Sequence, residues 1–438
     1  DFPAAELADS DEVAVGQWCF TVGNPFLLAT DFQPSVAWGL VSGVRRYQYP
    51  AGTILEYTDC IQVDTSINPG NSGGPLFNAA GELVGINGRG SFEKRGRVNS
   101  GAGYAISINQ IKLFMDHLKS GRVVDHATLG ATVTTQEDGG VVIAAILDSS
   151  EAYRRGLREG DEIVSFAGRP IRSVNQFKNI LGIYPKGWKL PLIYRRDEQR
   201  HKLLLRLRGL HRDSELSGQS PPQSRKRKRR PGQPKPKRKP GSKRKVAPRK
   251  PAPIPAKYKH LYIKKAGFAN YHFNLQEQTR TLSRLAELGD FTNRSGRWTI
   301  GGKTSAGDPF QFTLAKAGIG LEWKGKAFYQ SLEKGDPGDE PPGTGGLLYA
   351  LHQWRLFLAR RDKGFGQLFY LGSESLDGQG ERVDVMVTEL GNIRSRWYFD
   401  RARGALLGFD SQREEDVDEC ALRFSGARKH DGLNWPAT

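Results

Sequence analysis

A chain of 438 residues is long enough for roughly two to four domains with separate cores. It has no apolar run near the ~18 residues of a transmembrane helix, and its three cysteines do not make a disulfide framework. The net charge of +18 suggests nucleic-acid binding, but 15 Lys and Arg and no acidic residue lie between Arg225 and Lys250, which leaves about +3 elsewhere. The basic character therefore belongs to one segment. Because no basic or apolar leader follows Asp1, we expect a removed N-terminus or a fragment.

Residues 1–106 alternate short β-rich runs with Gly, Pro and Asn, for example "QWCFTVGNP", "VAWGLVSGV" and "YTDCIQVDTS". Closely spaced short strands separated by turn residues predict a barrel or a sandwich. A helix should follow, capped by Ser107 and Gln110 and ended by Gly121. Its predicted apolar face consists of Ile111, Phe114, Met115 and Leu118. We expect residues 1–123 to form one barrel with this helix packed against it.

Three further segments follow, and together they predict a mainly β, multi-domain chain. Residues 124–209 hold strand-like runs, a short helix near "SVNQFKNIL" and a hairpin turn at "RDEQ". Residues 210–257 are rich in Pro, Lys and Arg without apolar periodicity, which predicts a disordered basic linker. Residues 258–438 open with a helix ended by Gly289 and continue with period-2 runs such as "VDVMVTEL", which predict an α+β domain with an antiparallel sheet. The predicted apolar face of that helix consists of Leu275, Leu282, Leu285 and Ala286.

The stretch "INPGNSGGPLFN" at residues 67–78 places a serine between glycines. A serine hydroxyl is a weak nucleophile at neutral pH, so it needs a base for its proton and donors for the developing oxyanion. Glycines allow successive N–H groups to point at one spot, and the amides of Gly70 and Ser72 suit this role. The five residues GNSGG are equally typical of a tight turn between strands, and on their own they leave both interpretations open.

The flanks of this motif resemble a known family. In order along residues 8–121, the runs "ADSDEVAVGQWCFTVGNPF", "GLVSGVRR", "IQVDTSINPGNSGGPLFNAAGELVGING" and "GAGYAISIN" closely resemble the trypsin-like serine proteases of the Do/HtrA (Deg) family. The resemblance implies the second β-barrel of a chymotrypsin-like fold. It also implies that Ser72 is the acylated nucleophile and that the amides of Gly70 and Ser72 form the oxyanion hole.

The same resemblance implies roles for the neighbouring residues. Asn71 stands where digestive relatives carry an Asp that pairs with a freshly cut N-terminus, so no zymogen cleavage is implied. The residues implied to bind substrate are Ile67, Gly88 and Gly90. The two glycines are smaller than is usual for the family, which leaves the size of the specificity pocket open.

The family's base is a His, oriented by an Asp, and both precede the runs quoted above. In this chain all eight histidines follow Ser72. We therefore expect the chain to hold only the second barrel of a two-barrel protease, with the His and Asp of the triad missing. Loss of the base costs about six orders of magnitude in turnover, so the chain as written should be inactive. The apolar face that the two barrels share should also be exposed.

The run "GGVVIAAILDSSEAYRRGLREGDEIVSFAGRPIRSVNQFKNIL" within residues 124–209 resembles a PDZ domain. PDZ domains add a peptide as an extra strand and bind its terminal carboxylate through backbone amides. The loop "TLGA" would do this, so Leu129, Gly130 and Ala131 are the predicted residues that bind peptide C-termini. The alternative is a structural spacer or an oligomer contact.

Two segments remain open. The basic run at 225–250 is either a solvated spacer or a region attracted to an anionic surface such as lipid, cell-wall polymer or nucleic acid; its "RKRKRR" also has the form of a nuclear-localisation string. Residues 258–438 faintly resemble LolA-like lipoprotein carriers at "SRWYFDRARGALLGFDSQ", which implies a sheet that holds apolar ligands. An ordinary α+β binding or structural domain is the alternative.

The sequence therefore predicts a serine endopeptidase of Do/HtrA type that acts on unfolded or misfolded proteins in protein quality control. The resemblance implies the bacterial periplasm or another extracytoplasmic compartment and a homo-oligomer of the full-length protein. It implies no cofactor and no metal. The competing hypothesis is a non-catalytic scaffold or chaperone that binds peptides through its PDZ domain and anionic surfaces through its linker.

Overall fold

The structure is a computed structural model of the chain. It describes residues 3–25, 33–48, 56–92, 99–137, 139–216, 253–292, 294, 296–332, 343–378, 380–414 and 417–437. The basic run 225–250, and with it most of the predicted linker, lies outside these ranges. Within them the chain is mainly β, as predicted. No helix in the described ranges combines the length and the apolar character needed to span a membrane.

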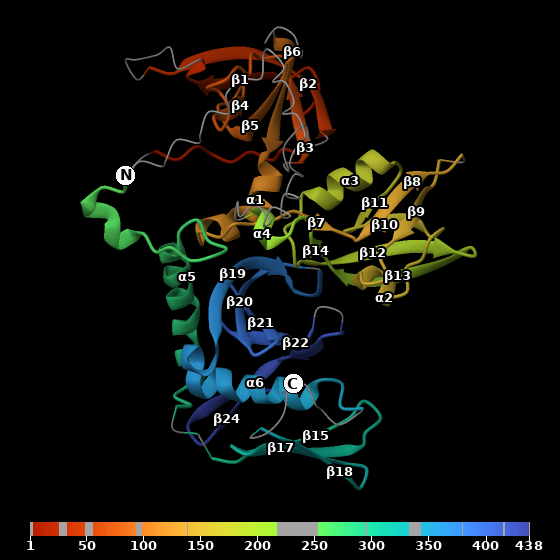
Figure 1. Ribbon diagram of the computed structural model, residues 1–438, viewed down its shortest axis with the longest axis vertical. Coiled ribbons are helices and arrows are strands. Elements are labelled where there is room, and N and C mark those ends of the chain that lie inside the picture. The colour runs from red at the N-terminus through yellow and green to blue at the C-terminus, as the bar shows by residue number, and fades with distance from the viewer. Residues whose placement is uncertain are drawn as a thin grey trace, which may run out of the picture.

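The first part is a closed β-barrel, called the barrel unit, with the strand order β1-β2-β3-β6-β5-β4 (Figure 1). Its strands are β1 (Trp18–Gly23), β2 (Ser35–Gln48), β3 (Tyr57–Val63), β4 (Pro75–Asn78), β5 (Leu83–Phe92) and β6 (Asn99–Ser107). Alternate side chains point inward, and Val63, Leu76 and Ala105 are fully buried in its core. Cys19 and Cys60 are buried in this unit, and none of the three cysteines, all of which lie in described residues, forms a disulfide.

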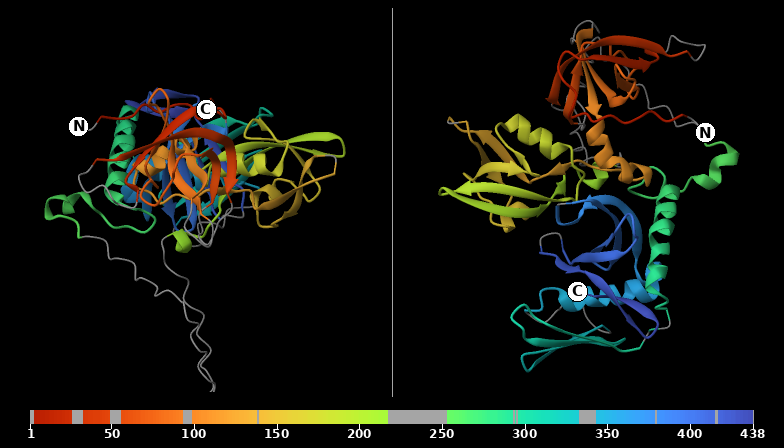
Figure 2. Two further views of the ribbon diagram at one scale, coloured as in Figure 1. Left: turned by 90° about the horizontal axis from the view of Figure 1, so that it is seen from above. Right: turned by 180° about the vertical axis from the view of Figure 1, so that it is seen from behind.

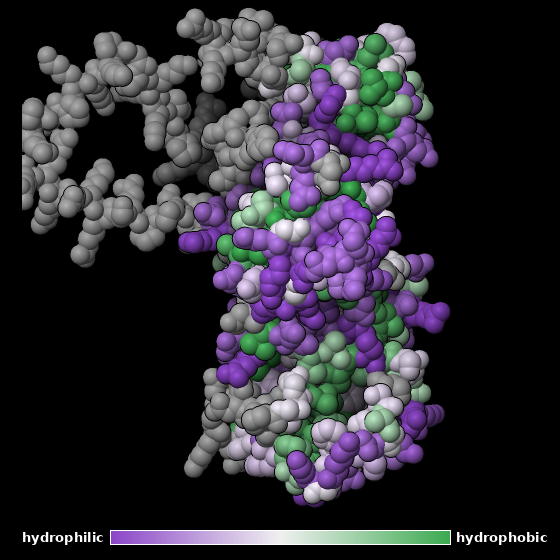
Figure 3. Space-filling view, turned by 90° about the vertical axis from the view of Figure 1, so that its right-hand side faces the viewer, coloured by the Kyte–Doolittle hydropathy of each residue, from purple (hydrophilic) through white to green (hydrophobic). Residues whose placement is uncertain are grey.

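The outer face of β1, β2 and β4 carries an exposed aromatic cluster. Phe20 lies opposite Trp38 on one side and Phe77 on the other, with ring centroids 4.8 Å and 5.1 Å apart. Trp18 and Trp38 remain 60% and 61% exposed. Apolar side chains are seen gathered over the barrel unit at the top of Figure 3. The barrel unit therefore exposes an apolar face, which is typical of a surface that another unit covers. That a first barrel covers this face stays a prediction.

Helix α1 (Ile108–Lys119) connects the barrel unit to the rest of the chain. The predicted glycine end is confirmed, because Gly121 has φ +69° and an added Cβ there would lie 2.1 Å from a backbone oxygen. The predicted capping box is wrong. Ser107 Oγ instead donates to Asp59 Oδ2 at 2.8 Å, so its hydroxyl ties the helix start to β3 and does not cap the helix.

The predicted apolar face of α1 is partly wrong. Leu118 is exposed, and the buried side chains are Ile108, Gln110, Phe114 and His117. The reason is that α1 packs against the barrel unit on one side and against β19 of the last part of the chain on another. A helix held between two units buries polar as well as apolar positions, which a single apolar stripe does not describe.

The second unit (residues 124–209) is a sheet of order β13-β12-β10-β9-β8, with β11 beside β10. Its elements and the short helix after it are β7 (Ala127–Thr128), β8 (Ala131–Thr135), β9 (Val141–Ile146), α2 (Glu151–Arg154), β10 (Glu162–Phe166), β11 (Arg169–Pro170), α3 (Val174–Gly182), β12 (Lys189–Arg196), β13 (Gln199–Arg206), β14 (Arg208–Gly209) and α4 (Asp213–Leu216). The "RDEQ" turn is confirmed: Asp197 and Glu198 have positive φ between β12 and β13. The core is built on Phe166, Phe177 and Leu192.

The last unit (residues 258–438) contains two antiparallel meanders with helix α6 between them (Figure 1). Its elements, with the 3₁₀ turn that leads into it, are η2 (Ala256–Leu261), α5 (Tyr271–Ser283), η3 (Arg284–Leu288), β15 (Trp298–Lys303), β16 (Pro309–Leu314), β17 (Gly318–Trp323), β18 (Lys326–Ser331), α6 (Leu347–Arg360), η4 (Arg361–Gly364), β19 (Gln367–Ser375), η5 (Leu376–Gly378), β20 (Arg382–Leu390), β21 (Ile393–Phe399), β22 (Leu406–Gln412), β23 (Cys420–Arg423), β24 (Gly426–His430) and β25 (Leu433–Ala437). Phe357 of α6 stacks on Trp397 of β21 at 4.0 Å in the core.

The predicted apolar face of helix α5 is wrong for the first half of the helix. Leu275 is exposed, whereas Asn274 is fully buried. The Asn274 side chain donates to the Tyr370 carbonyl at 2.8 Å and accepts from the Tyr370 N–H at 3.0 Å. It thus satisfies the outer edge of β19 as a neighbouring strand would, which explains a buried polar residue at this place.

A buried ionic cluster joins the second and last units. Arg206 of β13 is 7% exposed and donates to Asp410 Oδ2 at 2.6 Å, to Glu419 Oε2 at 3.0 Å and to the Tyr398 hydroxyl at 3.0 Å. Lys189 of β12 also pairs with Asp410, at 2.8 Å. Burial alone would raise the pKa of Asp410, but the cations Arg206, Lys189 and Arg423 hold it well below its ordinary value. The two units therefore meet through fixed, desolvated charges.

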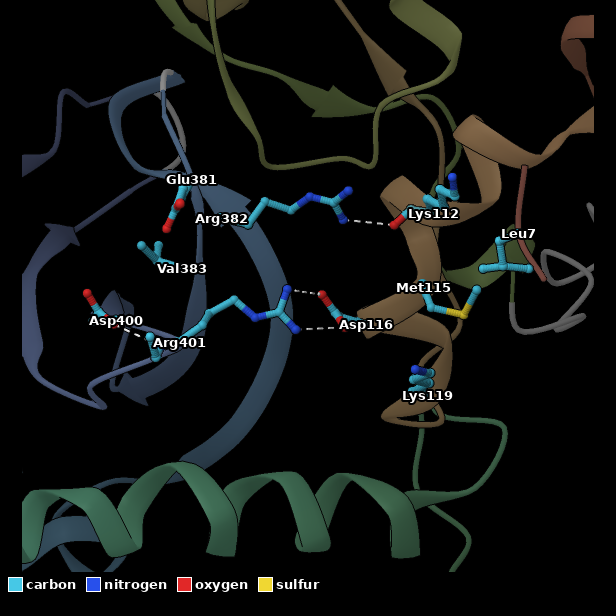
Figure 4. A pocket seen from close by; sticks show the side chains of 11 residues that line it. Leu7, Lys112, Met115, Asp116, Lys119, Glu381, Arg382, Val383, Asp400 and Arg401 are labelled. Carbon is cyan, nitrogen blue, oxygen red and sulfur yellow. Dashed lines mark hydrogen bonds and ion pairs between the residues drawn. The ribbon is translucent and has the colours of Figure 1, made fainter. Parts of the chain in front are cut away.

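The last unit also contacts α1. A cavity of about 550 Å³ lies between them, and the Arg401 guanidinium is 3.0 Å from the Asp116 carboxylate at its lining. Figure 4 shows these two side chains pointing toward each other. Arg382 donates to the Lys112 carbonyl at 2.8 Å beside it. Helix α1, which directly follows barrel strand β6, is thus held by the last unit at Lys112 and Asp116.

Candidate active site

The serine motif lies in the loop between β3 and β4, at residues 64–74. Two internal turns fold this loop, since the Asn71 N–H donates to Asn68 O and the Gly74 N–H donates to Asn71 O, both at 2.9 Å. The Gly73 N–H donates to Asn87 O on β5 at 2.7 Å. Gly70 and Gly73 have φ values of +111° and +87°, in the left-handed region that favours glycine. Residues 64–74 therefore form a tight loop that is hydrogen-bonded to β5.

The loop points two adjacent side chains in opposite directions. Ser72 is exposed, whereas Asn71 is 2% exposed and donates from Nδ2 to Ser66 O at 2.8 Å. Two close approaches leave no room for a side chain at Gly23 or Gly74 beside the loop. An added Cβ on Gly23 would lie 2.3 Å from Asn71 Oδ1, and one on Gly74 would lie 2.3 Å from Val22 O. No local pattern in the sequence marks Gly23, which precedes the motif by 47 positions at the end of β1.

The backbone donors of the loop divide into two sets. The N–H groups of Asn71, Gly73 and Gly74 are all used inside the fold. In the part of the chain that the structure describes, the N–H groups of Gly70 and Ser72 have no acceptor. These are the two amides predicted for an oxyanion hole, and an oxyanion hole requires donors that the protein itself leaves unused.

No base lies next to the serine in the described residues, where no side chain forms a hydrogen bond with Ser72 Oγ. Burial lowers the pKa of His117 to about 3, so its imidazole is neutral, but it packs against Gly372 of the last unit. His211 Nδ1 lies 2.8 Å from Asp125 Oδ1, and this His–Asp pair ties β14 to the start of the second unit. Neither histidine is connected to the serine loop.

The predicted substrate-binding residues lie on and beside β5. Ile67 is buried, and its side chain occupies the space where a Cβ on Gly103 would lie 2.6 Å from it. Gly103 is the strand partner of Gly90, so Ile67 and Gly90 lie close together. Gly88 contacts the Tyr57 ring, 2.5 Å from an added Cβ. Tyr57 could not be predicted as a neighbour of Gly88 from the sequence, because it lies on β3, far along the chain from Gly88, and belongs to no local motif.

The predicted peptide-binding loop of the second unit precedes β8, the last strand of its sheet in the described residues. Leu129 buries its side chain in the core, so only its backbone is available for binding. Gly130 has φ +73°, and its N–H already donates to Thr128 Oγ1 at 3.2 Å. Ala131 begins β8, and α3 packs beside that strand. The arrangement leaves an open strand edge between the loop and a helix, which is the geometry that strand addition needs.

Comparisons with known proteins match both units. A model of the trypsin-like peptidase domain matches residues 1–86, and a model of the PDZ domain matches residues 119–195. A "Probable periplasmic serine endoprotease DegP-like" of Pseudomonas savastanoi pv. phaseolicola is 34% identical over 229 residues, which cover 50% of this chain and 46% of that protein. The barrel unit is thus similar to trypsin-like peptidase domains and the second unit to PDZ domains, and together they are similar to Do-like (HtrA-type) serine proteases.

Further curated relatives and solved structures are similar to the same part of the chain. A protein of the same description from Marinomonas sp. is 32% identical over 231 residues, 50% of this chain and 47% of that protein. The chain thus spans about half the length of the curated relatives it matches. Among solved structures, the HtrA-type protease AlgW with tripeptide aligns with a TM-score of 0.38 and 29% identity, over 47% of this chain and 69% of that one. The serine endoprotease from Yersinia pestis aligns with a TM-score of 0.32 and 25% identity, over 48% and 68%.

Proposed function

We propose that the barrel unit carries the nucleophile and the oxyanion hole of a serine endopeptidase of Do/HtrA type. The observation that carries this proposal is the pair of unused N–H groups at Gly70 and Ser72, beside an exposed Ser72 side chain. Ser72 Oγ attacks the carbonyl carbon of a peptide bond, and the new oxyanion accepts hydrogen bonds from the two amides. The amine leaves with a proton, and water then releases the acyl group from Ser72.

The proton of Ser72 must pass to a base, which we assign to a histidine of a first barrel, oriented by an aspartate. The exposed cluster of Trp18, Phe20 and Trp38 supports this part of the proposal, because it offers an apolar face of the kind that a second barrel would cover. Without such a base, the remaining contributions come from the oxyanion hole and from binding, and turnover falls by about six orders of magnitude.

The second unit supports a role in capturing substrates. Its open β8 edge and the 128–131 loop suit an extended peptide, and the positive φ of Gly130 lets the backbone turn toward a terminal carboxylate. We propose that unfolded or misfolded proteins are the substrates and that their C-termini bind here. The name of the curated relatives supports a periplasmic or other extracytoplasmic location. We also propose that the full-length protein forms a homo-oligomer and that the basic run 225–250 is attracted to an anionic surface.

Degradation of a permanently unfolded protein by the natural full-length protein tests the central proposal. Ser72→Ala should abolish cleavage. Ser66→Ala, a matched change at an exposed serine of the same loop, should leave cleavage intact, because only the Ser66 backbone oxygen takes part in the loop. If both variants degrade the substrate like the unchanged protein, Ser72 is not the nucleophile. If the unchanged protein binds unfolded substrate without cutting it, the scaffold or chaperone function replaces the proposal.

A further inference from the structure

The segment that enters the last unit exposes a row of apolar side chains. Residues 253–264 are all exposed, and this segment projects from the body of the molecule in both Figure 1 and Figure 2. Its large apolar side chains and their exposed fractions are Ile254 36%, Tyr258 48%, Leu261 38%, Tyr262 43% and Ile263 36%. Exposure of aliphatic side chains to water is unfavourable, and several exposed apolar side chains that lie close together are typical of a binding surface.

This exposure is built into the fold. Asn270 accepts from the Ile263 N–H at 3.1 Å and donates to Leu261 O at 2.8 Å, which closes the loop onto the start of α5. The loop is also fastened to the end of α1, because the Val123 N–H donates to Gly267 O at 2.9 Å. Leu261, Tyr262 and Ile263 are thus held outward by a defined backbone, and their exposure does not depend on a frayed end.

The longer stretch of sequence that contains this segment is strongly basic. Between Glu215 and Glu277 the sequence holds 19 Lys and Arg and no acidic residue, so this stretch accounts for more than the whole net charge of +18 and leaves −1 elsewhere. Four of these lysines fall in the described part of the stretch, namely Lys257, Lys259, Lys264 and Lys265. None of the four forms an ion pair with a carboxylate in the described residues. Their charge is therefore available to an anionic partner.

We propose that this apolar-basic surface, residues 254–265, docks on a lipid bilayer that contains anionic lipids. Aliphatic side chains can enter the acyl boundary, tyrosines suit the headgroup level, and lysines attract anionic headgroups, so the segment combines the two signals that stable peripheral binding needs. A nucleic acid would use the lysines and could stack on the tyrosines, but it would leave Ile254, Leu261 and Ile263 in water. The inference rests on the proposed anionic-surface role only for its electrostatic part and is independent of the peptidase.

Co-sedimentation of the full chain with vesicles of phosphatidylcholine, with and without phosphatidylglycerol, tests this surface. The unchanged chain should bind only the anionic vesicles. The triple variant Leu261→Ser, Tyr262→Ser, Ile263→Ser should bind them roughly tenfold more weakly, and this loss should persist at high salt because it is apolar. Lys257→Gln with Lys259→Gln should weaken binding by roughly 25-fold at low salt, from about fivefold per lysine.

Matched controls lie on the β15–β18 sheet. Tyr329→Ser removes a tyrosine that is more exposed than Tyr262, at 63% against 43%. Lys316→Gln with Lys326→Gln removes the same charge as the lysine pair, and neither change should alter binding. If the triple variant binds anionic vesicles as the unchanged chain does, the basic run acts alone and the lipid-docking surface is refuted, while the anionic-surface role survives. If the unchanged chain ignores anionic vesicles, or binds duplex DNA more tightly and with no effect of the triple variant, the inference is overturned as well.

Discussion

Replacement of Arg206 by methionine should separate the second and last units. Arg206 is the central cation of their interface: besides Asp410, Glu419 and Tyr398, it reaches Glu374 at 3.4 Å and the Gly187 carbonyl at 2.7 Å. Methionine fills similar volume without charge, so the three carboxylates lose their main partner while they remain buried.

The expected cost follows from that burial. Removing one partner of a buried ion pair typically costs about 3–5 kcal/mol, because an uncompensated charge stays in a low-dielectric site. Lys189 and Arg423 still reach Asp410, both at 2.8 Å, so the cost should lie near the lower end, at about 3 kcal/mol. An exposed pair gives the contrast: Arg195 pairs with Glu162 on the same sheet with both groups partly in water, and its loss should cost well under about 1 kcal/mol.

Urea unfolding followed by tryptophan fluorescence is the assay, since five of the chain's eight tryptophans lie in residues 258–438. Arg206→Met should lower the unfolding midpoint of the last unit by about 1 M or more. Arg195→Met is the matched control and should shift the midpoint little. Equal midpoints for the two variants would refute the view that the buried cluster holds these units together.

Three further changes test other parts of the structure. Asn71→Asp should lower the free energy of unfolding by about 2–3 kcal/mol, because a buried carboxylate would face the Ser66 carbonyl, and an unchanged urea midpoint would contradict this. Gly130→Ala should weaken binding of a peptide C-terminus roughly tenfold, through backbone strain and because the new Cβ would lie 2.7 Å from Ser150 Cβ. Gly139→Ala, at φ +90° in open space, is the control and should leave the affinity unchanged. If fluorescence anisotropy shows an equal loss of affinity for both variants, the proposed binding loop is refuted. The pKa of His117 in the folded protein is lowered to about 3, so on acidification the unfolded chain takes up this proton first. The free energy of unfolding should therefore fall by about 2 kcal/mol from pH 7 to pH 5. His117→Gln should reduce this pH dependence, and an unchanged pH dependence in the variant would assign it to other groups.

The parts of the fold that were predicted correctly rest on local signals. Glycines at 70, 73 and 121 and the Asp197–Glu198 turn mark places where the backbone must adopt positive φ, and short β-rich runs mark the barrel strands. These signals act over a few residues, so a single sequence contains them in full.

The errors come from long-range contacts. Asn274 is buried because it completes the edge of β19, and Gln110 and His117 because α1 lies between two units; none of these gives an apolar period. The interface between the second and last units could not be predicted from the sequence for the same reason. Arg206 and Asp410 are 204 positions apart, and each is the kind of charged residue that usually lies in water.

The docked last unit gives the second unit a fixed place. Arg206 and Lys189 lie on β13 and β12, at the side of the sheet away from the β8 edge, so the interface leaves the proposed peptide edge uncovered. Arg401 and Arg382 hold α1, which directly follows barrel strand β6. The last unit thus contacts both the second unit and the helix that follows the barrel unit, which places it to hold the proposed peptide edge and the serine loop in one orientation.

The central claim is that Ser72 is a nucleophile whose base lies outside this chain. Labelling with a fluorophosphonate probe, followed by peptide mass spectrometry at Ser72, tests it most directly, because the probe reacts with a serine only when a base and an oxyanion hole act together. We predict a label on Ser72 in the natural full-length protein and none in this 438-residue chain. A label on Ser72 in this chain alone would contradict the assignment of the base, and no label in either protein would contradict the assignment of the nucleophile.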